Sequence, residues 1–169
     1  MKIDNKNRLW VCGGADGKIY VINLANGSLI KSWDVRTLFG AGFINDCIID
    51  SNYVYFTDSQ VQKIYRIRVT DNTPGDVQTW LTYTNAQIPF AATGTNANGI
   101  ENTADNKYLL VIVSSSGKLY RIDKATQAIG EISLNNGLTA GDGMYLDGSF
   151  LYVSRNATNQ IWPVRLDAS

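Results

Sequence analysis

Short apolar runs alternate with polar turn residues along the whole chain, and the runs come in pairs. Leu109-Leu110-Val111 is followed ten residues later by Leu119-Tyr120-Arg121, with Ser and Gly at 114–117 between them. Runs of this length, bounded by turn-forming residues, predict β-hairpins. The same ten-residue offset recurs in three further pairs, which begin at Leu9 and Ile19, Val54 and Ile64, and Leu151 and Ile161.

The four hairpins predict a repeat built from strands. Their first residues, at positions 9, 54, 109 and 151, are separated by 45, 55 and 42 residues. A period of about 40–50 residues is typical of the four-stranded blades of a β-propeller. No stretch keeps an apolar period of about 3.6 residues, so no helix is expected. We therefore predict an all-β fold, a single β-propeller domain over 1–169 with about four antiparallel blades at 1–34, 43–82, 97–134 and 142–169.

Each blade should also have an inner strand before its hairpin and an outer strand after it. Inner strands are expected at 44–50, 99–103 and 143–147, and outer strands at 28–33, 77–81 and 129–134. In a propeller the inner strands line the central channel, so their first residues lie together at one mouth. Any ligand site built from several blades is expected there.

Charge and hydropathy exclude two classes of partner. Lys plus Arg number 15 and Asp plus Glu number 15, and no segment concentrates basic residues, so neither nucleic acid nor an anionic membrane surface is expected as a partner. No apolar run approaches the roughly 20 residues that cross a bilayer. The first ten residues lack the apolar stretch of a secretory signal. The sequence leaves the cellular location unknown.

The sequence contains no histidine, which removes several kinds of chemistry. Ser-His-Asp and Cys-His nucleophiles, His-ligated zinc and imidazole bases are all excluded within the chain. Cys12 and Cys47 are the only cysteines. They are expected either as two buried free thiols or as one disulfide between neighbouring strands.

Polar residues open three of the predicted inner strands at a common register. Asn45, Asn98 and Asp142 precede the middle strands of their blades by 9, 11 and 9 residues, and we call these three residues the openers. Asn-Asp, Asn-Gly and Asp-Gly are ordinary turn pairs when they occur singly. Amide and carboxylate oxygens that converge on one axis would suit a hard cation such as calcium. The shared register favours a metal site over three unrelated turns.

Short motifs at these positions resemble a known family. The motifs are FIND at 43–46 with YFTD at 55–58, ANGI at 97–100 with YRID at 120–123, and DGM at 142–144 with LYV at 151–153. They are short but are spread over most of the chain, from 43 to 153. They resemble the six-bladed β-propellers of the gluconolactonase, senescence marker protein and luciferin-regenerating enzyme group. Relatives of that group include diisopropylfluorophosphatase, paraoxonase and strictosidine synthase.

The resemblance implies a calcium-dependent hydrolase of the lactonase or phosphotriesterase type. It assigns Asn98 and Asp142 as ligands of calcium, or of another divalent metal, and Asp142 also as a catalytic base. It assigns Asn45 as a further metal ligand or as an amide that contacts the substrate. In such enzymes the calcium ion polarises a lactone carbonyl or a phosphoryl oxygen of a small-molecule substrate.

Two departures from the family pattern support an alternative. The first-blade glutamate that ligates calcium in the family has no counterpart, and four blades are present where the family has six. The offset of nine residues also places the opener of the first blade before Met1. An open propeller exposes apolar faces and strand edges at both ends. The alternative is a non-catalytic propeller or propeller fragment that binds a partner or assembles with itself. Its open ends would be covered in a homo-oligomer or by missing blades that another segment supplies, which we favour over a compact closure of four blades.

Overall fold

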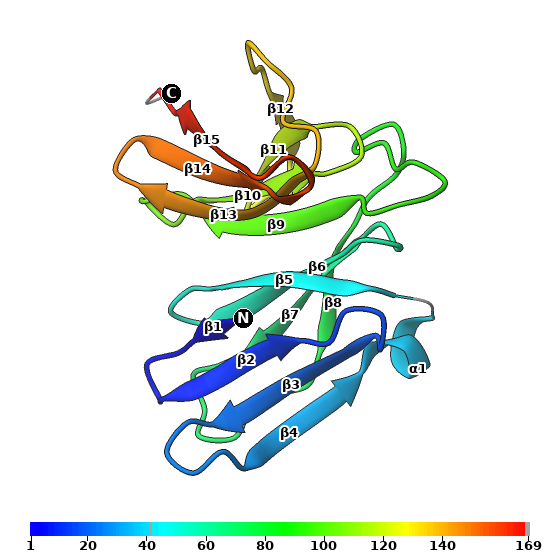
Figure 1. Ribbon diagram of the computed structural model, residues 1–169. Helices are drawn as coiled ribbons and strands as arrows, with labels where there is room; N and C mark the ends of the chain where they lie inside the picture. The colour runs from blue at the N-terminus through cyan, green and yellow to red at the C-terminus, as the bar shows by residue number, and fades with distance from the viewer. Residues whose placement is uncertain (41, 168–169) are drawn as a thin grey trace. The chain divides into compact units, whose positions relative to one another are not determined.

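The computed structural model describes residues 1–40 and 42–167, which form four antiparallel sheets (Figure 1). Neighbouring strands in each sheet are consecutive in the chain. The first sheet contains β1 (Lys2–Ile3), β2 (Arg8–Cys12), β3 (Lys18–Asn23) and β4 (Leu29–Asp34). The second contains β5 (Ile44–Ile49), β6 (Tyr53–Asp58), β7 (Lys63–Arg68) and β8 (Gln78–Thr82).

The third sheet has four strands and the last has three. The third contains β9 (Ala97–Asn102), β10 (Tyr108–Val113), β11 (Lys118–Asp123) and β12 (Ile129–Ile132). The last contains β13 (Gly141–Asp147), β14 (Phe150–Arg155) and β15 (Gln160–Arg165). The all-β prediction of a β-propeller of about four blades is confirmed. Positions 168 and 169 of the predicted fourth blade lie outside the described residues.

The chain divides into two compact units. The first unit, Met1–Tyr83, holds the first two sheets, and the second unit, from Thr84 onward, holds the other two. The predicted single domain over 1–169 stays a prediction.

Two short helices correct the expectation that no helix forms. Helix α1 (Val35–Phe39) follows β4, and a single 3₁₀ turn, η1 (Asn156–Thr158), joins β14 to β15. The carboxylate of Asp34 accepts a hydrogen bond of 2.9 Å from the amide of Thr37, which satisfies one of the free donors at the start of α1. One turn needs only this local cap and no apolar period, so the periodicity gave no sign of it. The described part of the chain has no helix with the length and apolar character of a membrane span.

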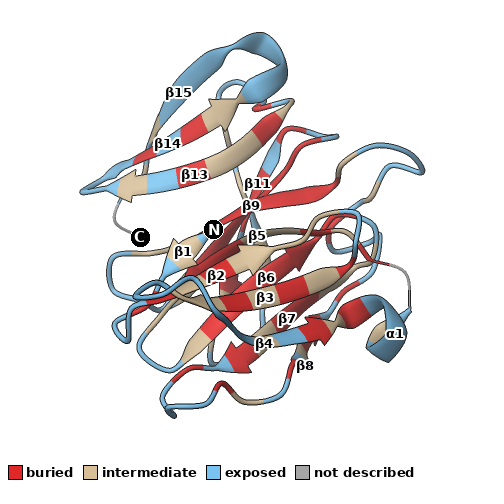
Figure 2. Cartoon of the chain, turned by 60° about the horizontal axis from the view of Figure 1, so that its bottom comes forward, coloured by how far each residue is buried: buried red, intermediate tan, exposed pale blue. Residues whose placement is uncertain are grey.

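Aromatic side chains form the core of the first unit. The rings of Trp10 in β2 and Trp33 in β4 stack with centroids 5.9 Å apart, and Phe56 of the second sheet lies 6.3 Å from Trp10. These residues are buried, with Ile19, Val21, Ile44, Cys47 and Val54 around them. Figure 2 shows the buried positions running along the strands of both sheets. In the first unit, aromatic side chains therefore pack between the two sheets.

A buried ion pair connects the first sheet to the second. Asp4, in the turn between β1 and β2, accepts hydrogen bonds from Arg8 Nε at 2.7 Å and from Trp10 Nε1 at 2.9 Å. The guanidinium of Arg8 then reaches the segment after β7 and donates to the carbonyl oxygens of Val69 and Asp71 at 2.8 and 3.1 Å. Asp4 and Arg8 are 8 % and 3 % exposed, so this network lies out of water.

The second unit has its own aliphatic core between the third and last sheets. Its buried members are Leu110, Ile112, Leu119, Leu138, Met144, Leu151 and Val153. Strand β9 lies beside β13, because a Cβ atom built on Gly99 would stand 2.0 Å from the carbonyl oxygen of Asp142. The two openers of this unit, Asn98 and Asp142, are thus on neighbouring strands.

Candidate functional site

All three openers lie in the same structural feature, a β-bulge in the inner strand of a sheet. In β5, Ile44 pairs with Asp58 and Cys47 pairs with Phe56, so two residues, Asn45 and Asp46, stand opposite a single residue of β6. The pairs of β9 and β13 break their register in the same way around Asn98-Gly99 and Asp142-Gly143. Because the residue before each opener already pairs, β9 and β13 begin before their openers, two residues earlier than predicted.

A hydrogen bond closes each of these bulges. The side-chain amide of Asn45 donates to Ser59 Oγ at 2.8 Å, and that of Asn98 donates to Ser114 Oγ at 2.8 Å. In the last sheet the polarity is reversed, and Asn156 Nδ2 donates to Asp142 Oδ2 at 2.7 Å. In every case the partner is the residue directly after the second strand of the sheet. The openers therefore have a structural task in common, which is to hold the bulge against the end of the next strand.

The three partners were missed by the sequence analysis. Ser59, Ser114 and Asn156 follow the openers by 14, 16 and 14 residues, a recurrence of small polar residues that was present in the sequence. The recurrence was overlooked because Ser59, Ser114 and Asn156 lie in segments that were interpreted only as hairpin turns.

A polar cavity adjoins this feature in the second unit. Its volume is about 340 Å³, and its lining includes Asn98, Ser114, Ser115, Thr139 and Asn156. Ser114 Oγ also donates a hydrogen bond to the carbonyl oxygen of Gly141. The lining offers amide and hydroxyl groups without a carboxylate.

The donor set of the second unit falls short of a calcium site. Asn98 and Asp142 contribute one amide and one carboxylate, whereas calcium takes about six to eight oxygen ligands. The nearby carboxylate of Glu101 accepts a hydrogen bond from the amide of Asn102 at 2.9 Å. Among the residues that the structure describes, no group of three or more Asp, Glu, Cys or His side chains is arranged to hold a metal ion. Asn45 belongs to the first unit. Calcium ligation by the three openers and catalysis by Asp142 stay predictions.

Glycine follows two of the openers, and the two glycines differ in their surroundings. Gly99→Ala is expected to destabilise the second unit by about 3 kcal/mol or more, because the new methyl group would meet the Asp142 carbonyl 2.0 Å away and force β9 and β13 apart. Gly143→Ala is the matched control, since nothing lies within 4 Å of its Cβ position. Urea unfolding of both variants measures the difference. Equal stability of the two variants would mean that β9 and β13 do not pack as described.

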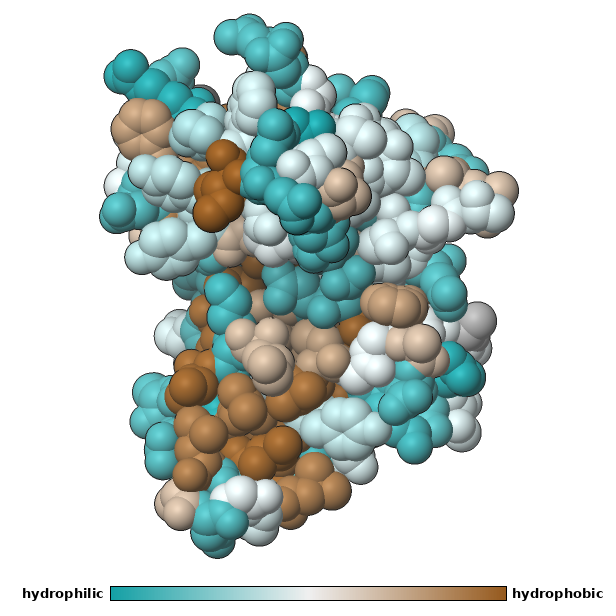
Figure 3. Space-filling model, viewed as in Figure 1, coloured by the Kyte–Doolittle hydropathy of each residue, from teal (hydrophilic) through white to brown (hydrophobic). Residues whose placement is uncertain are grey.

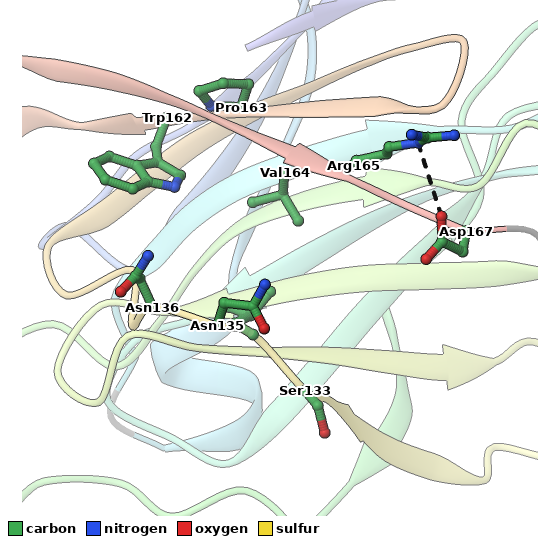
Figure 4. A pocket seen from close by; sticks show the side chains of 9 residues that line it. Ser133, Asn135, Asn136, Trp162, Pro163, Val164, Arg165 and Asp167 are labelled. Carbon is green, nitrogen blue, oxygen red and sulfur yellow. Dashed lines mark ion pairs between the residues drawn. The ribbon is translucent and has the colours of Figure 1, made fainter.

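Another cavity of the second unit lies along β15 (Figure 4). Its volume is about 480 Å³, and it is lined by residues 133–136 after β12 and by Trp162 to Arg165. In Figure 4 the indole of Trp162 and the amide of Asn136 face each other across the opening, and Arg165 pairs with Asp167 at 3.8 Å. Among the described residues β15 has no fourth strand beside it, unlike the third strands of the other sheets. None of the openers lines this cavity.

The outer face of the first sheet is apolar. Pairing places Ile3, Leu9, Ile22 and Leu29 in one row across the four strands, with Val11 and Tyr20 beside them. The opposite face carries the buried Trp10 and its neighbours. Ile3 and Leu29 are 61 % and 57 % exposed, and Figure 3 shows apolar side chains gathered over this sheet. We call these six residues the first end face.

The last sheet has a similar outer face. Tyr145, Tyr152 and Pro163 lie in one row across β13, β14 and β15, while Met144, Leu151 and Val153 point the other way into the core. Tyr145 and Ile161 are 63 % and 72 % exposed. The last end face consists of Tyr145, Phe150, Tyr152, Ile161 and Pro163.

Comparison with known proteins shows the fold. No protein-family model matches the chain, and neither does any curated protein sequence. A catalytically inactive virginiamycin B lyase from Staphylococcus aureus, crystallised with quinupristin, superposes with a TM-score of 0.70 at 18% identity, over 98% of this chain and 54% of the lyase. A streptogramin B lyase superposes with a TM-score of 0.67 at 17% identity, over 96% of this chain and 49% of the lyase. The computationally designed Ika4 protein superposes with a TM-score of 0.62 at 9% identity, over 98% of this chain and 89% of Ika4.

These similarities establish a β-propeller and no particular activity. The chain spans about half the length of the two lyases, at 54% and 49%. A propeller domain from Myceliophteria thermophila Cps50 (Swd1) is similar as well, with a TM-score of 0.66 at 10% identity. Membership of the gluconolactonase group stays a prediction.

Proposed function

We propose that this chain is a non-catalytic β-propeller module that assembles with a second copy of itself through its two end faces. The observation that supports the proposal is that the first and the last sheet both turn an apolar outer face to solvent. Contiguous exposed apolar surface of this kind is unusual for a monomer and marks an interaction site.

The chemistry of the end faces favours another propeller sheet as the partner. Inside the first unit, the inner face of the first sheet is covered by the second sheet through side chains of the same kind, such as Trp10 against Phe56. All β-sheets twist with the same hand, so two sheets can pack face to face with their twists matched. The first end face of one copy and the last end face of another are thus suited to each other. Two copies would hold about as much chain as one of the lyases.

The energetics are sufficient for association. Burying one large apolar side chain stabilises a complex by about 1.5–3 kcal/mol. Five such residues on the last end face would contribute about 7.5–15 kcal/mol if each were fully exposed beforehand. They are only partly exposed in the single chain, so their share falls below this range and below the upper part of the roughly 4–15 kcal/mol that association costs in lost translational and rotational freedom. The proposal therefore requires both faces, in a head-to-tail contact.

Hydrogen exchange at two protein concentrations tests this proposal. On raising the concentration, amides in residues 2–29 and 145–163 should become protected together, because both faces are covered in one contact. Amides of β6 and β10, which lie in the buried middle of their sheets, serve as internal controls. Protection of only one face, or of neither, would refute head-to-tail assembly.

A calcium-dependent hydrolase is the second candidate, supported by the common bulge register of Asn45, Asn98 and Asp142. Calorimetric titration with calcium and turnover of a lactone and a phosphotriester test it. We expect no turnover by the purified chain, because the openers hold the bulges. Turnover that requires calcium and disappears in Asp142→Ala, with Asp46→Ala unaffected, would establish the hydrolase instead.

A further inference from the structure

We propose that Cys12 and Cys47 form a modification site, a thiol pair that oxidises to a disulfide and joins the first sheet to the second. This inference is independent of the proposed function. Both cysteines are free thiols in the structure, in agreement with one of the two alternatives from the sequence. Cys47 is fully buried in the core of the first unit, and Cys12 is half-buried and packs against that core.

The backbone brings the two cysteines near each other. Gly14, just after β2, and Ile44, at the start of β5, exchange two backbone hydrogen bonds of 2.9 and 3.2 Å in an antiparallel bridge. Cys12 lies two residues before Gly14, and Cys47 lies three residues after Ile44, just beyond the bulge at Asn45-Asp46. Both cysteines therefore lie within three residues of the bridge that joins the first sheet to the second.

The two thiols are neighbours, because Cys12 packs against the buried cluster that contains Cys47. The nearby Cys47 thiol and burial together raise the pKa of Cys12 well above its usual value. A raised pKa keeps the thiolate scarce at neutral pH, so oxidation should be slow there and faster in alkali.

The reaction requires an external disulfide such as oxidised glutathione. The thiolate of the half-buried Cys12 attacks one sulfur of glutathione disulfide, forms a mixed disulfide and releases one glutathione thiol. The thiolate of Cys47 then attacks the Cys12 sulfur and releases the second glutathione. The two cysteine thiols lose their protons on forming thiolates, and the two released glutathione thiolates take up two protons. The two electrons lost by the cysteines reduce the glutathione disulfide to two glutathione thiols.

Intact-mass measurement of the native chain with oxidised glutathione at pH 7 and pH 8.5 tests the inference. We expect the loss of two hydrogen atoms, with faster conversion at the higher pH. Tryptic digestion should then yield a cross-link between peptides 9–18 and 37–63. The oxidised chain should melt higher than the same chain in dithiothreitol, by about 5–15 °C, because the bond closes a long loop.

Two outcomes would overturn the inference. One is a wild-type chain that keeps both thiols at pH 8.5, and the other is a stable adduct of glutathione without an internal cross-link. Cys12→Ser is the control, and its mass and melting temperature should not respond to oxidised glutathione. Comparing oxidised and reduced wild-type chains avoids any dependence on how well the variant folds.

Discussion

Replacing Asp4 with alanine is expected to lower the free energy of unfolding of the first unit by about 3–5 kcal/mol. The Asp4 carboxylate accepts hydrogen bonds from Arg8 Nε, Trp10 Nε1 and the amides of Lys6 and Arg8, at 2.7 to 3.1 Å. Without it, the guanidinium of Arg8, 3 % exposed, would lose its counter-ion while still buried. Urea unfolding followed by tryptophan fluorescence reports the loss, because Trp10 and Trp33 lie beside this network.

The control for Asp4→Ala is Asp76→Ala. Asp76 also pairs with a basic residue, Lys31, at 3.1 Å, but its side chain is 91% exposed. Exposed pairs contribute about 0–1 kcal/mol, so this variant should unfold almost as the wild type does. An equal loss of unfolding free energy in the two variants would show that burial does not increase the contribution of the Asp4–Arg8 pair to stability.

The same network predicts a dependence of stability on pH. Burial alone would raise the pKa of Asp4, but hydrogen bonds from Trp10 and Arg8 outweigh it and lower that pKa below its ordinary value. A carboxyl group with a lowered folded-state pKa stabilises the fold above its unfolded pKa, about 3.9, and this contribution disappears as the pH falls through the folded-state value. Wild-type stability should therefore fall below about pH 4 more steeply than that of Asp4→Ala.

Placing two lysines on the last end face is expected to weaken self-assembly at least roughly 100-fold. Tyr145 and Ile161 are 63 % and 72 % exposed, so Tyr145→Lys with Ile161→Lys should leave the monomer folded. In the assembled state two ammonium groups would have to leave water for an apolar contact, which costs several kcal/mol without a partner. Sedimentation equilibrium measures the change in the dissociation constant.

Leu38→Lys is the matched control for this double variant. Leu38 lies in α1, is 56 % exposed and belongs to neither end face. Its replacement changes the charge and removes an exposed apolar side chain, yet should leave the dissociation constant within about twofold, since residues outside an interface contribute little. Equal weakening by Leu38→Lys would point to a general effect of charge and against the last end face.

The sequence predicted the hairpins and the openers because both depend on local pattern. The two strands of a hairpin, such as β10 and β11, are separated by a turn rich in Ser and Gly. The openers precede the second strands of their sheets at a nearly constant distance along the chain. The hairpins and the openers could therefore be predicted without knowing the tertiary contacts.

Tertiary contacts explain what the sequence analysis missed. The bonds of Asn45 to Ser59 and of Asn98 to Ser114 depend on a bulge, and a bulge leaves no mark in the apolar pattern. The nearness of Cys12 and Cys47 could not be found by counting residues either, because it depends on the bridge between Gly14 and Ile44, which belong to different sheets. The open edge of β15 required knowledge of which strands pair.

Sedimentation velocity of the wild-type chain over a wide concentration range is the decisive measurement. The chain has a mass of 18.6 kDa. Assembly through two apolar end faces predicts a sedimenting mass that rises with concentration to that of two chains or more, and that stays at one chain for the double lysine variant. A wild-type chain that sediments as one chain at every concentration would contradict the proposed function.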